Sequence, residues 1–140
     1  MHNQHQRTDK FTPNQIYDFV IQHHKAERAG PHYDLRIGNS RIGLHSWATK
    51  KTMPGPGERI GVYPTPVHSY GWGKFEGTIA AGRGKGTVTK HYDGKVKVTK
   101  SDKDSLHFTD ITNKELKRYA LVRSTNTPKD SWLLTRAKKD

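Results

Sequence analysis

The stretch Gly86–Lys100, "GTVTKHYDGKVKVTK", carries the strongest β-structure signal in the chain. Val96 and Val98 alternate with lysines, which is the period-2 pattern of a strand with one buried face. Asp93-Gly94 separates two β-prone runs, and an Asp-Gly pair between such runs is the typical signal of a two-residue hairpin turn. The stretch therefore predicts two antiparallel strands that meet at Asp93-Gly94.

Further short β-prone runs lie on both sides of this stretch, and Gly38-Asn39-Ser40 separates two of them as a second hairpin turn. Two segments favour a short helix: Thr12–Phe19 has Pro13 at its first helical position, and Thr112–Ala120 begins with a capping box. The pattern predicts a mainly β protein, a small closed antiparallel β-barrel of about seven or eight strands with one or two short helices. The other β-prone runs are Phe19–Gln22, His32–Ile37, Arg41–Ala48, Ser105–Phe108, Tyr119–Arg123 and Ser131–Arg136.

Length and charge narrow the class of protein. The chain has 140 residues, the size of one domain, with residues 1–11 predicted as a flexible tail and residues 12–140 as the domain. The net charge of +12 favours a protein that binds nucleic acid. The alternative is a basic protein that has no nucleic-acid partner. No long apolar run or amphipathic helix supports membrane binding, and the chain has no cysteine for a thiolate metal site. We expect a cytoplasmic monomer.

The segment His23–Arg36, "HHKAERAGPHYDLR", concentrates groups that can bind metal and phosphate. On a strand, His32, Asp34 and Arg36 share one face. The alternate residues, which resemble a core face, are Tyr33, Leu35 and Ile37. A row of imidazole, carboxylate and guanidinium is costly to bury unless its members are paired or bind a ligand.

Two interpretations of this row stay open from spacing alone. With His24 or His23 as a third ligand, His32 and Asp34 complete a two-histidine, one-carboxylate set that suits Mn²⁺, with Zn²⁺ as the rival. Arg36 would then clamp a phosphate oxygen. The alternative is a His–Asp hydrogen bond and an Asp–Arg surface pair with no metal.

The Pro- and Gly-rich segment Lys50–Tyr70 is predicted to be a long functional loop. Its His68 can act on a phosphate as donor or general acid, or be a structural or merely exposed histidine. Lys51 and Arg59 can hold a phosphate or simply be solvated. The glycines of Gly77–Thr87 fit no phosphate-loop or dinucleotide motif, so a flexible basic turn is the favoured interpretation there.

The order of these motifs resembles the 3′-phosphoesterase domain of bacterial DNA ligase D. The matching segments, from about Phe19 to Arg136, are "FVIQHH", "HYDLR", "SWATKK", an arginine, a histidine closely followed by "FEGTI", "YALVR" and "WLL". The resemblance implies a small β-barrel with a Mn²⁺-dependent activity that removes a 3′-terminal ribonucleoside and then the 3′-phosphate, leaving a 3′-OH for repair. We expect a stand-alone member, since no ligase or polymerase module is present.

The resemblance also implies roles for individual residues. The metal ligands would be His24, His32 and Asp34; the residues that grip the phosphate, Arg36 and His68; the supporting basic residues, Lys51 and Arg59. Trp72 stands where the family usually has an active-site tyrosine, and Tyr70 lies two residues earlier, so either can stack on a substrate base or sugar. Two extra residues, Gly30-Pro31, precede His32 and are expected to bulge if His24 is to reach the metal.

These features predict an enzyme that acts on DNA or RNA 3′ ends, such as a primer–template, with a DNA ligase or polymerase as partner in trans. The alternative is a non-catalytic basic nucleic-acid-binding β-barrel in a repair complex, which the change to Trp72 and the high positive charge favour. A nuclease acting on internal phosphodiesters is a third interpretation.

Overall fold

The computed structural model describes residues 8–82, 84–124 and 130–138 of the chain. The described residues form nine strands and one 3-10 helix. They are β1 (Ile16–Ala26), β2 (Gly30–Asn39), β3 (Gly43–Thr49), β4 (Arg59–His68), η1 (Tyr70–Lys74), β5 (Gly77–Ile79), β6 (Gly86–Asp102), β7 (Ser105–Asp110), β8 (Lys117–Arg123) and β9 (Trp132–Arg136). In these ranges no helix has the length and apolar character needed to span a membrane.

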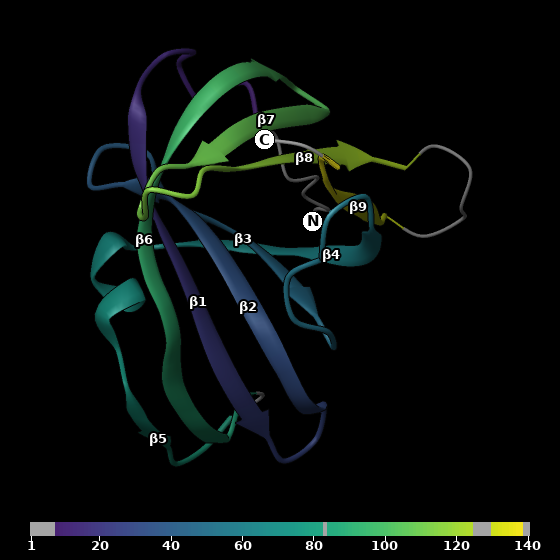
Figure 1. Ribbon diagram of the computed structural model, residues 1–140. Coiled ribbons are helices and arrows are strands. Elements are labelled where there is room, and N and C mark those ends of the chain that lie inside the picture. The colour runs from purple at the N-terminus through teal and green to yellow at the C-terminus, as the bar shows by residue number, and fades with distance from the viewer. Residues whose placement is uncertain (1–7, 83, 125–129, 139–140) are drawn as a thin grey trace.

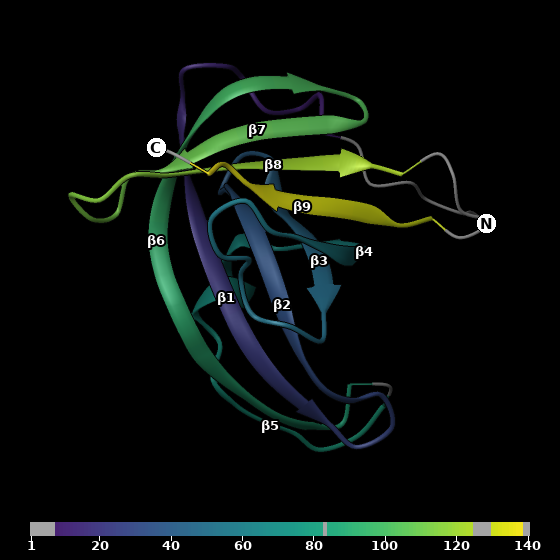
Figure 2. The same ribbon diagram turned by 45° about the vertical axis from the view of Figure 1, so that its right-hand side comes forward.

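Eight of these strands form an antiparallel, barrel-like ring. Their order is β1-β2-β3-β4-β9-β8-β7-β6, and β6 pairs with β1 to close the ring. Figure 1 shows β1, β2 and β6 side by side as long curved strands, and Figure 2 shows β8 and β9 adjacent to each other across the ring. The short β5 adds to one end of β6. The predicted mainly β, barrel-like fold is therefore confirmed.

The strand β6 closes the ring without turning back on itself. Its residues run continuously from Gly86 to Asp102, so the predicted hairpin at Asp93-Gly94 is wrong. Asp93 and Gly94 pair with β1 instead. A Cβ atom on Gly94 would lie 2.2 Å from the Thr112 hydroxyl, so this glycine permits a close approach rather than a turn. The tertiary pairing outweighs the local turn signal.

Both predicted helices are wrong for a similar reason. Within Thr12–Phe19 the chain enters β1 at Ile16, and Thr112–Ala120 runs into β8. Phe19 and Tyr119 belong to the hydrophobic core, so strand pairing and burial outweigh capping signals that are weak by themselves.

The Pro- and Gly-rich segment Lys50–Tyr70 is not the continuous loop that was predicted. Its second half is β4, which pairs with β3 and β9. Pro64 lies opposite Trp47 within this strand, and Pro66 lies in the irregular stretch that follows. Proline is tolerated at strand positions and bulges where the ladder needs no N–H donor.

Alternate residues of the ring strands fill its interior. The largest fully buried side chains include Tyr17, Phe19, Ile37, Trp47, Phe108 and Trp132. Residues 1–7 of the predicted tail lie outside the described residues, but Thr8 and Phe11 are buried. The Thr8 hydroxyl donates to the Ser105 carbonyl at 2.8 Å, so the ordered domain begins before residue 12.

His45 lies on the core side of β3 and makes the stability of the fold depend on pH. It is 4% exposed and packs edge-on against Phe11. Burial, aided by the charge of Lys10, lowers the pKa of His45 to about 4. The unfolded chain takes up this proton near pH 6.5, so stability is complete above that pH and is lost as the pH falls toward 4.

We expect urea unfolding to detect this effect. Between pH 7 and pH 4.5 the wild-type protein should lose about 2–3 kcal/mol more unfolding free energy than His45→Leu, whose side chain cannot take up a proton. His107→Leu on β7 serves as the control and should follow the wild type. Equal pH dependence of wild type and His45→Leu would contradict this assignment.

Candidate metal and phosphate site

The site is built on the face of β2 that points away from the core. Leu35 and Ile37 belong to the hydrophobic core, so the predicted alternation along this strand is confirmed. His32, Asp34 and Arg36 therefore share the opposite face. Asp34 and Arg36 are nonetheless buried, because η1 and its flanking segments cover part of this face.

The β1–β2 hairpin brings His24 next to this row. His24 lies directly opposite His32 in the antiparallel ladder, and pairing continues to Ala26 opposite Gly30. The extra Gly30-Pro31 thus lengthens the hairpin in regular register, and the predicted bulge is wrong. His23 points to the other face of the sheet, where its ring stacks with Tyr33 at 4.6 Å. Of the two histidines, only His24 joins the cluster.

The three potential ligand atoms converge on one point. One atom from each of His24, His32 and Asp34 lies within 4.8 Å of the others. The Asp34 carboxylate oxygen Oδ2 is 3.7 Å from His24 Nδ1 and 3.4 Å from His32 Nε2. The strand register alone produces this arrangement, since two of the residues are directly opposed and the third is two positions along the same face.

Backbone carbonyls set the tautomers of both imidazole rings. His24 Nε2 lies 2.7 Å from the Gly84 carbonyl, and His32 Nδ1 lies 3.2 Å from the Gly30 carbonyl. An N–H that donates to each carbonyl leaves the lone pair on the nitrogen that faces Asp34. Histidines that bind metals are typically oriented in this way by their second nitrogen. A divalent metal therefore fits this donor set.

The electrostatics keep Asp34 ionised. Burial by itself would raise the pKa of Asp34, but the hydrogen bond from His32 and the charge of Arg36 outweigh it and hold the pKa below its ordinary value. The hydrogen bond to Asp34 in turn raises the pKa of His32, against the effect of burial. Without a metal, a proton on His32 offsets the buried carboxylate; a divalent cation would displace that proton.

Arg36 is held beside the carboxylate by two residues that sequence analysis missed. Its Nε donates to Gln22 Oε1 at 2.5 Å and its Nη1 donates to Ser46 Oγ at 2.9 Å, while Nη2 lies 3.6 Å from Asp34. Gln22 is fully buried and donates to the carbonyls of Trp72 and Phe75. The strand period could have indicated Gln22, two positions before His24.

A β-bulge in β4 brings His68 to the same face. Thr65 lies opposite Ser46 and His68 lies opposite Leu44. Between these two pairs β4 has two residues where β3 has one, which is a β-bulge. His68 Nδ1 is 2.8 Å from the Pro66 carbonyl and 3.2 Å from Arg36 Nη1. Burial, followed by the charge of Arg36, lowers the pKa of His68.

Three clustered ligands and an adjacent arginine and histidine are a suitable arrangement for phosphate chemistry, and comparison with known families agrees. Residues 22–123 match the sequence model of the family described as the DNA ligase D 3′-phosphoesterase domain. The chain belongs to this family. Membership supports a phosphoesterase role, and the matched range includes every residue of the site described above. A comparison with curated proteins found no match.

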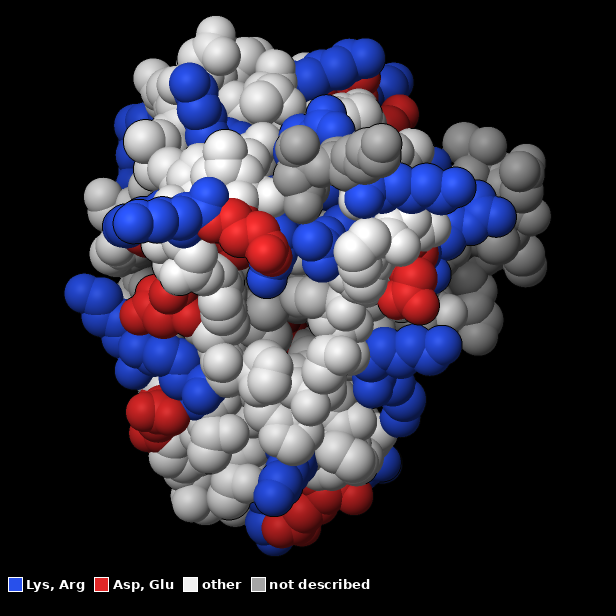
Figure 3. Space-filling view, viewed as in Figure 1, with Lys and Arg blue, Asp and Glu red and all other residues white. Residues whose placement is uncertain are grey.

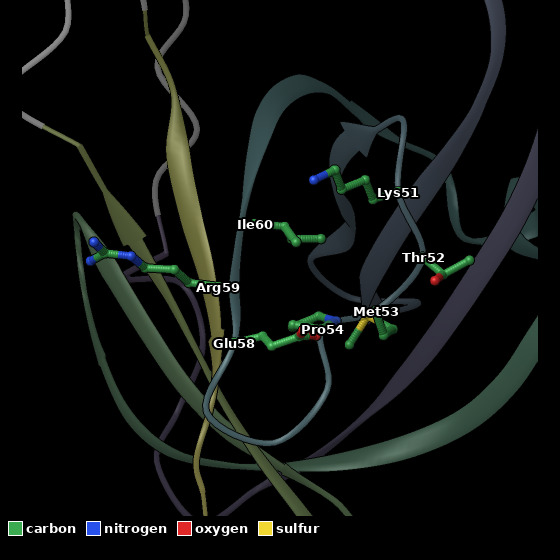
Figure 4. Close-up of a pocket in the computed structure, with 7 residues that line it drawn as sticks. All are labelled: Lys51, Thr52, Met53, Pro54, Glu58, Arg59 and Ile60. Carbon is green, nitrogen blue, oxygen red and sulfur yellow. The ribbon is translucent and has the colours of Figure 1, made fainter.

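Two basic residues that the family resemblance predicted to support phosphate binding line a pocket that does not include the metal ligands. Lys51 and Arg59 line a separate pocket of about 550 Å³ beside Met53 and Glu58. Figure 4 shows that the Arg59 side chain points away from the other labelled side chains, so the two basic groups do not converge. The neighbouring Lys50 lies nearer the metal ligands, because its Nζ donates to the Ala29 carbonyl in the β1–β2 turn at 3.2 Å.

The two aromatic residues predicted to bind substrate are engaged in different ways. Trp72 stacks with His68 at 5.7 Å and with Phe75 at 4.7 Å, so it supports the histidine of the site. Tyr70 donates its hydroxyl to Asp18 at 2.5 Å, and the Lys74 ammonium lies over its ring. Both rings are thus already in contact with other side chains.

Positive charge is dispersed over one face of the phosphoesterase domain. On the face shown in Figure 3, Lys and Arg side chains lie mostly around the periphery, with single Asp and Glu side chains among them. The middle of this face is largely uncharged.

Proposed function

We propose that the protein is a Mn²⁺-dependent phosphoesterase that removes the phosphate from 3′ ends of DNA or RNA and leaves a 3′-OH for repair. Removal of a terminal ribonucleoside would precede this step on ribonucleotide ends. The observation that carries the proposal is the orientation of His24 and His32, whose Nδ1 and Nε2 atoms converge with an Asp34 carboxylate oxygen beside a buried arginine.

His24, His32 and Asp34 would hold the divalent ion. Two nitrogens and one oxygen suit Mn²⁺, with Zn²⁺ as the alternative. When bound, such an ion polarises a phosphoryl group. The remaining steps depend on the protein's own side chains.

Arg36 would bind the phosphate. Its Nε–H and one Nη1–H donate to Gln22 and Ser46, which leaves N–H groups of the guanidinium, above all on Nη2, for a phosphate oxygen. Because the guanidinium is already positioned, it can offset charge that develops in the transition state without reorganising. Gln22 and Ser46 act as positioning residues in this scheme.

Water would attack the phosphorus as the bond to the 3′ oxygen breaks, and His68 would donate a proton to that leaving oxygen. The shorter of its two Nδ1 contacts is to the Pro66 carbonyl, so Nδ1–H donates there and Nε2 remains free. Its lowered pKa favours the neutral ring in the free protein. An anionic phosphate beside the ring favours protonation of Nε2, and this N–H can then donate to the leaving oxygen.

A gel assay on a 5′-labelled primer–template tests the proposal. One substrate ends in a 3′-phosphate and a second ends in a single 3′-ribonucleotide, each with Mn²⁺, Zn²⁺, Mg²⁺ or a chelator. We expect conversion of the 3′-phosphate to a 3′-OH with Mn²⁺ and none with the chelator. Equal conversion in chelator would contradict metal dependence, and a circular substrate that is cut would indicate an internal nuclease.

The same assay separates the enzyme from a binding protein. Salt-sensitive binding of the primer–template without conversion of either end would favour a non-catalytic repair module. Conversion of the phosphate end alone would direct attention to Trp72, which has no phenol to offer at the position of the family's tyrosine. Recruitment of a DNA ligase or polymerase in trans would follow from a 3′-OH product.

A further inference from the structure

One aromatic side chain near the site is largely exposed. All 3 Trp, 6 Tyr and 4 Phe lie in the described ranges, and Tyr63 is the only one of them in the exposed class, at 53%. Exposing a large ring to water gains nothing for folding. Rings that bind single-stranded nucleic acid are exposed in this way, because a base can stack on them.

The strand register places Tyr63 in line with the metal ligands. Asp34 on β2 lies opposite Ala48 on β3, and Ala48 lies opposite Tyr63 on β4. Residues directly opposed across a sheet share a face, so all three project to the outer side. Two strand spacings separate Asp34 from Tyr63, or about 10 Å.

The surface between Asp34 and Tyr63 is formed by small residues. Ala48 contributes only a methyl group, and a Cβ atom on Gly61, the next residue of β4 on this face, would meet nothing within 4 Å. Lys50, directly after the end of β3, lies at the border of this surface. Its Nζ lies 3.8 Å from the Cβ position of Gly30, two residues before His32, and it is anchored to the Ala29 carbonyl.

We propose that Tyr63 stacks on the base that precedes the 3′-terminal nucleotide, while Lys50 contacts the phosphate between the two. This subsite rests on the proposed function, and it assigns to the substrate a path from the metal ligands over Ala48 to β4. It would make the enzyme prefer an oligonucleotide with an unpaired penultimate base over a lone nucleotide. Stacking of this kind tolerates any base.

Binding measurements test the subsite without requiring turnover. The probe is a fluorescent single-stranded oligodeoxynucleotide with a 3′-phosphate, titrated by anisotropy in chelator so that it stays intact. We expect Tyr63→Ala to raise Kd about tenfold, while Tyr63→Phe keeps the stacking and binds like the wild type. Lys50→Ala should weaken binding and reduce its dependence on salt.

An abasic oligonucleotide separates stacking from a general loss of affinity. When the penultimate position has no base, Tyr63→Ala should bind as the wild type does. Val122→Ala, another exposed apolar residue on β8, is the control and should leave Kd unchanged. An unaltered Kd for Tyr63→Ala, an equal loss on the abasic probe, or no binding by the wild type would overturn the subsite. Absence of phosphate removal in the gel assay would instead overturn the proposed function.

Discussion

Replacing His32 with alanine should lower turnover of the 3′-phosphate substrate at least a thousandfold and weaken Mn²⁺ binding, because two ligands remain where three converge. The fold should survive. His32 is half-buried, and its ring makes a single hydrogen bond to a backbone carbonyl besides its contact with Asp34. Thermal unfolding in chelator should remain cooperative, at a somewhat lower temperature than in the wild type, because the buried Asp34 carboxylate loses the hydrogen bond from His32 but keeps Arg36.

Manganese affinity, measured by electron paramagnetic resonance, provides a readout that does not depend on turnover. His107→Ala on β7 is the matched control, since it removes an imidazole from another part of the ring and should change neither affinity nor turnover. Wild-type turnover in His32→Ala would exclude the metal site. A loss of turnover with unchanged manganese binding would assign His32 to the substrate instead.

Replacing Arg36 with lysine should lower kcat/KM for the 3′-phosphate about a hundredfold or more. Lysine keeps the positive charge beside Asp34, but its single ammonium group cannot donate to Gln22, Ser46 and a phosphate from one planar group. Manganese binding should be retained. The two variants thus divide the site into a metal part and a phosphate part.

At this position, lysine is a cleaner substitution than alanine. Removing the guanidinium would leave the Asp34 carboxylate buried without its charge partner, which costs about 3–5 kcal/mol and confuses stability with catalysis. Arg41→Lys, in the exposed β2–β3 turn, is the control for the substitution itself. An unchanged kcat/KM in Arg36→Lys would show that charge alone suffices there.

The outcome of the hairpin prediction shows where local signals fail. Asp93-Gly94 has the residues of a tight turn, yet it lies within β6 because β1 supplies a partner along most of that strand. The helix signal in Thr12–Phe19 failed similarly, since Phe19 is worth more in the core than a capped turn would be in water. In both cases the observed strand is stabilised by contacts with residues far away in the sequence.

The β class of the protein and the row of polar groups on one face of β2 can be predicted from the sequence. Both follow from the period of two residues in a strand, which is a local property of the backbone. The same period would have indicated Gln22, which sequence analysis overlooked. The positive charge and the family motifs can likewise be taken from the sequence.

Which groups share a site depends on tertiary contacts that the sequence does not reveal. The lengthened hairpin set His24 opposite His32 and left His23 on the other face. The bulge in β4 re-aimed His68, while Lys51 and Arg59 were carried to another pocket. These placements depend on register and closure between strands far apart in the chain, where a shift by one residue reverses the face of every side chain.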